Sequence, residues 1–300
     1  MPTDPDPRPV VAAVDESGSS RDAALWAADL AADWSAPLHL LHVPEGDPQD
    51  PPRPAPDWLA ELADGARRSG ADPVTTEVQP GEVVPTVAGR AVGARMVVLG
   101  SYGRGAAAGM LAGSVALGVA GRVACPIAVV RGSASQLPPP RSGPVVVGVD
   151  DSPAGSAAVA FAADLAESLG TELLAVHAWT DVVVDPEGVP VRRRESPTEL
   201  AAEAEEVLDR RLQPVLAAQR RSSVVRRLVE GTPLQVLLDA GRSARVLVVG
   251  TRGRTGFTGI LTGSTSTALI GFAPCPVIVV HPRATNGERT GETVSGEVSA

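Results

Sequence analysis

Residues 100–114 read GSYGRGAAAGMLAGS, and residues 250–264 read GTRGRTGFTGILTGS. Four positions of the first segment recur in the second at an offset of 150 residues: Gly100, Gly103, Gly113 and Ser114 return as Gly250, Gly253, Gly263 and Ser264. Each segment follows a short apolar run and precedes an apolar stretch that reads as a helix. A repeated glycine-rich turn between a strand and a helix predicts two copies of one domain.

Three further pairs of segments extend this repeat along the chain. VVAAVDES (10–17) matches VVVGVDDS (145–152), GARMVVLG (93–100) matches SARVLVVG (243–250), and ACPIAVV (124–130) matches PCPVIVV (274–280). The offset grows from 135 to 150 residues, so the second half carries fifteen additional residues between positions 178 and 231. We expect domains at 8–132 and 144–282, a linker rich in proline, serine and glycine at 133–143, and a disordered polar tail at 283–300.

Within each half, β-branched runs alternate with alanine-rich amphipathic stretches. In the first half the runs lie near 9–14, 38–43, 73–78, 96–100 and 126–130. Apolar residues follow one another in these runs without alternation, which favours parallel strands that are covered on both faces. The fold class predicted is α/β: two tandem Rossmann-like domains, each a five-stranded parallel sheet flanked by helices.

Composition and charge argue against several classes of protein. The 300 residues carry a net charge of −9, whereas a nucleic-acid surface needs a basic stripe. No apolar run is as long as a membrane span, and the first residues, MPTDPDPRPV, lack the basic and apolar regions of a signal peptide. We therefore expect a cytoplasmic protein with no nucleic-acid or membrane partner. Cys125 and Cys275 occupy equivalent positions, and we interpret them as small buried hydrophobic residues.

A ligand crevice is expected where two loops meet at the carboxyl ends of the strands. In a doubly wound sheet, ligands bind where the strand order reverses. Asp15 follows the first strand of its half, as Asp150 does in the second, and the glycine-rich turn follows the fourth strand. Glycines let the backbone approach an anion, and the helix N-terminus after Gly113 attracts phosphate. Arg104 and Arg254 would neutralise that phosphate, so each half is predicted to form a nucleotide crevice.

Other readings of these residues fit less well. The Walker phosphate loop needs Gly-Lys-Ser/Thr, which neither half contains, and a dinucleotide fingerprint fits only the first half. The glycines could serve only tight turns, but two copies with the same spacing disfavour this. His42 and His177 are equivalent and near the crevice; a packed strand histidine is favoured over a catalytic base.

The spacing Gly-x2-Gly-x9-Gly-Ser, with VDES or VDDS at the first strand and Cys-Pro before the last, resembles the universal stress protein family. The resemblance is to the tandem two-domain form of its ATP-binding branch, and it implies that each Rossmann-like domain is adenine nucleotide α-hydrolase-like. It implies that Asp15 and Asp150 contact the nucleoside and that the backbone of Val43 and Ala178 reads the adenine edge. The residues implied to surround the nucleotide are Ala13, Asp15, Val43, Leu99, Gly100, Gly103, Arg104, Gly113, Ser114 and Val115 in the first half, and Gly148, Asp150, Ala178, Val249, Gly250, Gly253, Arg254, Gly263, Ser264 and Thr265 in the second.

The resemblance also implies a function and partners. The ligand would be ATP, with AMP or ADP as alternatives and Mg²⁺ held with the phosphates. The protein would be a stress-response regulatory module that acts through an unidentified protein partner. A slow ATPase or phosphotransferase and a nucleotide-free dimerising scaffold are the alternatives; the sequence offers no catalytic set and no metal-ligand cluster. The near-identical terminal runs PIAVV (126–130) and PVIVV (276–280) would pair antiparallel, giving an intramolecular pseudo-dimer, or a homodimer.

Overall fold

Strands and helices alternate along both halves of the chain, as predicted. The computed structural model describes residues 8–47, 49, 51, 53–101, 114–132, 137–184, 190–218, 220–251 and 263–282. The first half contains β1 (Val10–Val14), α1 (Gly18–Asp33), β2 (Leu38–His42), α2 (Asp57–Arg68), β3 (Val74–Val78), α3 (Val83–Arg90), β4 (Met96–Gly100), α4 (Ser114–Ala120) and β5 (Ile127–Val130). The second half contains β6 (Val145–Gly148), α5 (Pro153–Ser168), β7 (Leu173–Trp179), β8 (Val182–Val184), β9 (Pro190–Arg192), α6 (Pro197–Ala217), β10 (Val224–Glu230), α7 (Pro233–Gly241), β11 (Val246–Gly250), α8 (Ser264–Phe272) and β12 (Val277–Val280).

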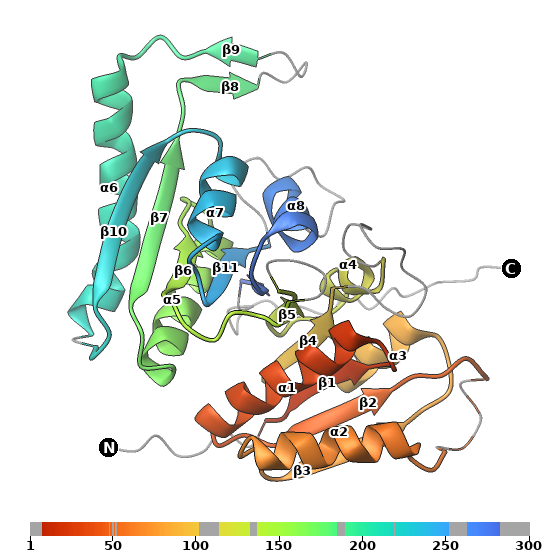
Figure 1. Cartoon of the computed structure of the whole chain (residues 1–300). Coiled ribbons are helices and arrows are strands. Elements are labelled where there is room, and N and C mark those ends of the chain that lie inside the picture. The colour runs from red at the N-terminus through yellow and green to blue at the C-terminus, as the bar shows by residue number, and fades with distance from the viewer. Residues whose placement is uncertain are drawn as a thin grey trace, which may run out of the picture.

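The main strands of both halves form one sheet of ten strands in the order β10-β7-β6-β11-β12-β5-β4-β1-β2-β3 (Figure 1). Each half therefore has its five strands in the same order, and the order reverses between the first strand and the fourth. β1 pairs with β4 in parallel, with Ala13 beside Leu99, and β6 pairs with β11 in parallel. The loops after these neighbouring strands consequently share one edge of the sheet in each half.

The two halves are joined by their last strands. β5 and β12 pair antiparallel, with Val129 opposite Val277 and Ile127 opposite Val279, while every other neighbouring pair in this sheet is parallel. All the residues of β5 and β12 are buried. An apolar edge that would otherwise invite aggregation is thus covered within the chain.

Two hydrophobic cores run across this seam, one on each face of the sheet. The first includes α1, α2, α5 and α6, and the second includes α3, α4, α7 and α8; both contain residues of the two halves. Alanine dominates the helix faces: Ala23, Ala24, Ala27, Ala28 and Ala31 of α1 are all fully buried. Side chains this small let a helix lie close to the sheet, which explains how a chain with only 3% aromatic residues fills its cores.

Polar and aromatic contacts add to the seam. The rings of Trp34 and Phe161 meet edge to face across it, with 6.4 Å between their centroids. Arg131, which follows β5, donates to the carbonyl oxygens of Ile270 and Gly271 at the end of α8, where the helix dipole favours a cation. The seam therefore involves the ends of helices as well as the two strands.

The fifteen additional residues of the second half lie in two places. β8 and β9 form a separate antiparallel hairpin beyond β7, and Figure 1 shows it projecting from the body of the sheet. The helix that follows, α6, has 21 residues, whereas its counterpart α2 has 12. Ser196 and Glu199 form a capping box at the start of α6, which fixes where this helix begins. Among the described residues, no helix is long and apolar enough to cross a membrane.

Because β5 and β12 are buried and paired with each other, we expect a charge within either strand to destabilise the whole chain. Val129→Asp and Val279→Asp each place a carboxylate at a fully buried position, with an expected loss of about 3 kcal/mol or more in the free energy of unfolding. Chemical denaturation followed by circular dichroism measures this loss. Val225→Asp on the edge strand β10, where the side chain is 38% exposed, is the matched control and should cost far less. Small-angle scattering that showed two independently moving domains in the unsubstituted chain would contradict the arrangement.

Candidate functional site

The glycine-rich turn of each half begins in direct contact with the helix that follows the first strand. Gly100 ends β4 against the first turn of α1, where a Cβ on Gly100 would lie 2.7 Å from Ser19 Oγ and 2.9 Å from the Ser19 carbonyl carbon. Gly250 ends β11 in the same way, since its Cβ would lie 2.7 Å from the carbonyl carbon of Ala154. Only glycine fits such an approach of backbone to backbone.

Hydroxyl groups hold this contact in place in the first half. Ser101 N donates to Ser19 Oγ at 2.9 Å, and the two hydroxyl oxygens are 3.4 Å apart. Both serines are buried. The start of the glycine-rich turn is thereby tied to the helix that follows the Asp15 loop. Sequence reasoning missed these two serines; the available signal was that Ser101 recurs as Thr251, which keeps the hydroxyl.

In the second half, the two ends of the glycine-rich segment meet. Gly263 N donates to the carbonyl oxygen of Thr251, and Ser266 Oγ donates to that oxygen at 3.4 Å. Gly263 is the N-cap residue of α8, and none of the described side chains caps the start of this helix. The N-terminus of α8 therefore lies beside the end of β11. A helix N-terminus in this position is one that could receive an anion.

The aspartates of the first loops brace the helices that follow. Asp15 Oδ1 accepts a hydrogen bond from Ser17 N, and Asp150 Oδ1 accepts one from Ser152 N, each at 3.0 Å. Ser17 and Ser152 are the N-caps of α1 and α5. One oxygen of each carboxylate is therefore used within its loop, a local role that the sequence analysis did not foresee.

The two aspartates are not held alike. In the first half Ser20 Oγ accepts a hydrogen bond from Asp15 N at 3.1 Å. The equivalent residue in the second half is Gly155, where a Cβ would lie 2.1 Å from Asp150 Oδ1. The Asp150 carboxylate occupies that space and takes a second, short hydrogen bond of 2.6 Å from Ser152 Oγ. The two candidate sites are thus related but not identical.

The other residues expected at the site divide by exposure. The side chains of Ala13, Leu99 and Val249 are buried in the core beneath it, so only their backbone can face a ligand. Val43, Val115, Gly148, Ala178 and Thr265 are half-buried, and Ser114 and Ser264 are exposed at the first turns of α4 and α8. Gly103, Arg104, Gly113, Gly253 and Arg254 lie outside the described residues.

The equivalent histidines His42 and His177 each form a hydrogen bond from the ring to the backbone at the end of the neighbouring strand. His42 Nδ1 lies 2.9 Å from the carbonyl oxygen of Val14, and His177 Nδ1 lies 2.7 Å from that of Val149. Because a carbonyl only accepts, each ring carries a proton on Nδ1 and donates it. The ring of His42 also meets Trp58 edge to face, with centroids 4.9 Å apart. Both contacts favour the packed strand histidine over the catalytic base.

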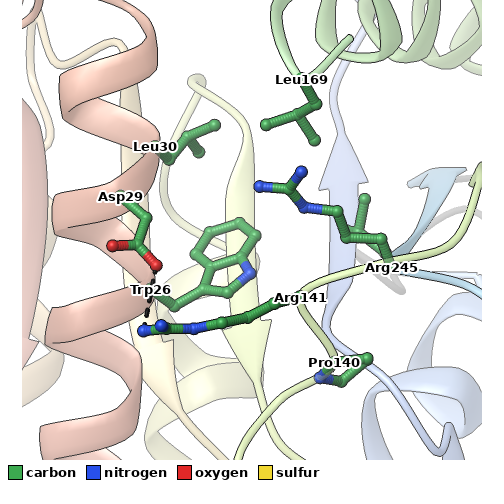
Figure 2. Close-up of a pocket in the computed structure, with 8 residues that line it drawn as sticks. Trp26, Asp29, Leu30, Pro140, Arg141, Leu169 and Arg245 are labelled. Atoms are coloured by element: carbon green, nitrogen blue, oxygen red, sulfur yellow. Dashed lines mark ion pairs between the residues drawn. The ribbon is translucent and has the colours of Figure 1, made fainter. Parts of the chain in front are cut away.

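One small cavity lies at the seam and does not belong to this site. It has a volume of about 20 Å³, room for roughly one water molecule. Figure 2 shows Arg141 of the linker beside Asp29 of α1, with their charged atoms 3.2 Å apart, and Arg245 on the opposite wall. Val246 of the lining begins β11, whereas the candidate site starts at Gly250, at the other end of that strand. The cavity is part of the joint between the halves.

The fold and the repeat define a tandem Rossmann-like protein, and comparison with known proteins identifies its family. Residues 7–131 and 142–281 each match the universal stress protein family. Two universal stress proteins of Mycobacterium tuberculosis are similar over almost the whole chain. One is 39% identical over 292 residues, covering 91% of this chain and 96% of that protein; the other is 32% identical over 294 residues, covering 92% and 97%.

A solved universal stress protein from Archaeoglobus fulgidus has a TM-score of 0.64 at 19% identity, covering 91% of this chain and 98% of that one, which supports the fold. The chain therefore belongs to the universal stress protein family, in its tandem-domain form. The resemblance to this family in its tandem form, and the α/β fold class predicted from the alternating strand and helix segments, are both confirmed.

The contact at the end of β4 predicts opposite effects for one substitution at two glycines. Gly100→Ala forces α1 away from the sheet and should cost about 1–3 kcal/mol in the free energy of unfolding. Gly89→Ala in α3, where nothing lies within 4 Å of the new Cβ, should stabilise the chain by up to about 1 kcal/mol. Urea denaturation of both variants tests the pair, and an equally harmless Gly100→Ala would disprove the close contact.

The cysteines are expected to be unreactive in the folded protein. Burial raises the pKa of the Cys125 thiol to about 11 and that of the Cys275 thiol to about 12. Because the thiolate is the reactive form, both should react slowly with a disulfide reagent at pH 8, and both should react at once in denaturant. Rapid modification of a native thiol would argue for a redox role instead.

Proposed function

We propose that this universal stress protein binds one adenine nucleotide in each domain and acts as a cytoplasmic regulatory module whose shape or partner choice depends on occupancy. The observation that supports this most is the contact of Gly100 with Ser19, and of Gly250 with Ala154. It brings the aspartate loop and the glycine-rich turn, which are distant in the sequence, to one place at the carboxyl edge of each half.

The chemistry of that place suits a nucleotide. The carboxylates of Asp15 and Asp150 can accept hydrogen bonds from ribose hydroxyl groups, through oxygen positions not used by the serine N-caps. The uncapped start of α8 offers backbone N–H groups and positive dipole charge to phosphates. The exposed hydroxyl of Ser264 lies at that first turn, where it would help to hold Mg²⁺ with the phosphate oxygens. ATP is our proposed ligand, with AMP or ADP as alternatives.

Titration calorimetry with ATP and Mg²⁺ should give two nucleotides bound per chain. Gly113→Glu and Gly263→Glu should each remove one of them, because the new carboxylate would take the phosphate position and repel its charge. Gly89→Glu, which adds the same charge at an exposed position of α3, is the matched control and should leave both. A stoichiometry near zero for the unsubstituted chain would overturn the proposal, and full affinity in both motif variants would overturn the phosphate assignment.

Hydrolysis of ATP is expected to be slow, well below the turnover of about 10 s⁻¹ that is typical of enzymes. Phosphate-loop enzymes normally rely on a lysine that contacts the phosphates and on a group that orients the attacking water. The glycine-rich segments contain no lysine. A phosphate-release assay measures the rate. Rapid release that Gly263→Glu abolishes would favour the alternative, an ATPase or phosphotransferase.

A further inference from the structure

The loop that carries Asp150 is held from outside by helix α6. Arg211 Nη2 donates to the Asp151 carbonyl oxygen at 2.8 Å and to Asp151 Oδ1 at 2.7 Å, while its Nη1 donates to Ser156 Oγ in α5. Arg210 Nη2 adds a hydrogen bond of 3.1 Å to the same carboxylate oxygen. One guanidinium group thus joins the backbone of the loop, its acidic side chain and the start of the next helix.

The two arginines differ in burial, and the Asp151 carboxylate that they share is 32% exposed. The side chain of Arg211 is only 23% exposed, whereas that of Arg210 is 55% exposed. Desolvation raises the pKa of Asp151. The hydrogen bonds and positive charges of Arg210 and Arg211 together lower it by more, so the net shift of this pKa is downward. The carboxylate therefore stays ionised at neutral pH and keeps both arginines bound. A planar guanidinium with several donors fits such a site in a way that a lysine does not.

The first half has different chemistry at these positions. The helices α2 and α6 end at equivalent residues, with C-caps at Ser69 and Ala218, and this offset of 149 residues places Glu61 and Leu62 where the second half has Arg210 and Arg211. Glu16 stands in the place of Asp151. Neither the side chain of Leu62 nor an ionised glutamate can donate a hydrogen bond to a loop carbonyl. The contact that Arg211 makes therefore has no counterpart at the equivalent position of α2.

We propose that Arg211 is a positioning residue that fixes the loop presenting Asp150 and thereby raises the nucleotide affinity of the second-half site. This inference rests on the proposed function. A loop that is already ordered loses less conformational freedom when a ligand binds, so more of the contact energy appears as affinity.

The test uses the full chain with one site blocked at a time and MgATP as the probe. With Gly113→Glu blocking the first half, adding Arg211→Met should raise the Kd of the remaining site about tenfold. Methionine keeps much of the apolar stem but removes every donor. Arg211→Lys keeps the charge without the paired donors and should give an intermediate Kd. With Gly263→Glu blocking the second half instead, Arg211→Met should leave the Kd unchanged.

Arg220 provides the matched control. It also bridges to α5, with its Nη1 at 2.6 Å from Asp164 Oδ1 and 3.2 Å from Glu167 Oε2, and it is 21% exposed. Arg220→Met should lower the melting temperature about as much as Arg211→Met does, but it should leave the Kd of the second site unchanged.

The outcomes separate the two proposals. If the unsubstituted chain binds no nucleotide, both fail. If it binds two but Arg211→Met and Arg211→Lys leave the second Kd unchanged, or Arg220→Met changes it equally, only the role of Arg211 fails.

Discussion

The antiparallel pairing of β5 with β12 is the constraint on which the rest of the structure depends. Each half builds a parallel sheet that ends in an apolar strand, and such a strand needs a partner. By using each other, the two halves form one sheet of ten strands and two cores that cross the seam. Because β5 and β12 run in opposite directions, their carboxyl ends lie at opposite ends of the seam. Each half therefore builds its candidate site from its own strands and loops.

The order of strands within each half then determines where that site lies. The first and fourth strands are neighbours, so the loop with the aspartate and the glycine-rich turn leave the sheet together. The glycine at the end of the fourth strand brings the turn onto the first turn of the helix, and the serine N-cap fixes the aspartate beside it. The residues that pack the aspartate loop against the glycine-rich turn are thus neighbours of those that we propose to contact the ligand.

Much of this could be predicted from the sequence because a repeat supplies its own internal comparison. Two copies of one glycine spacing indicated the repeat and its strands, and the near-identical terminal strands indicated how the halves meet. The ligand site at Asp15 and Asp150 stays a prediction. Details that depend on contacts between distant side chains could not be predicted. Ser19 gave no signal of its pairing with Ser101, and nothing in the sequence of α6 showed that Arg211 reaches back to Asp151. The hairpin of β8 and β9 was visible only as additional length.

The differences between the halves are as informative as the likeness. Ser20 in one half and Gly155 in the other impose different positions on equivalent aspartates, because a Cβ at Gly155 would occupy the space of the carboxylate. A duplicated fold can in this way keep one architecture while the surroundings of its equivalent aspartates differ.

Amide hydrogen exchange of the full chain, measured by mass spectrometry with and without MgATP, tests the central claim most directly. The account predicts slower exchange on ligand addition in four segments, around 15–20, 100–116, 150–155 and 250–266, with the buried amides of β5 and β12 slow in both conditions. Protection that appeared only at the seam, or no protection in the glycine-rich segments at saturating MgATP, would contradict it.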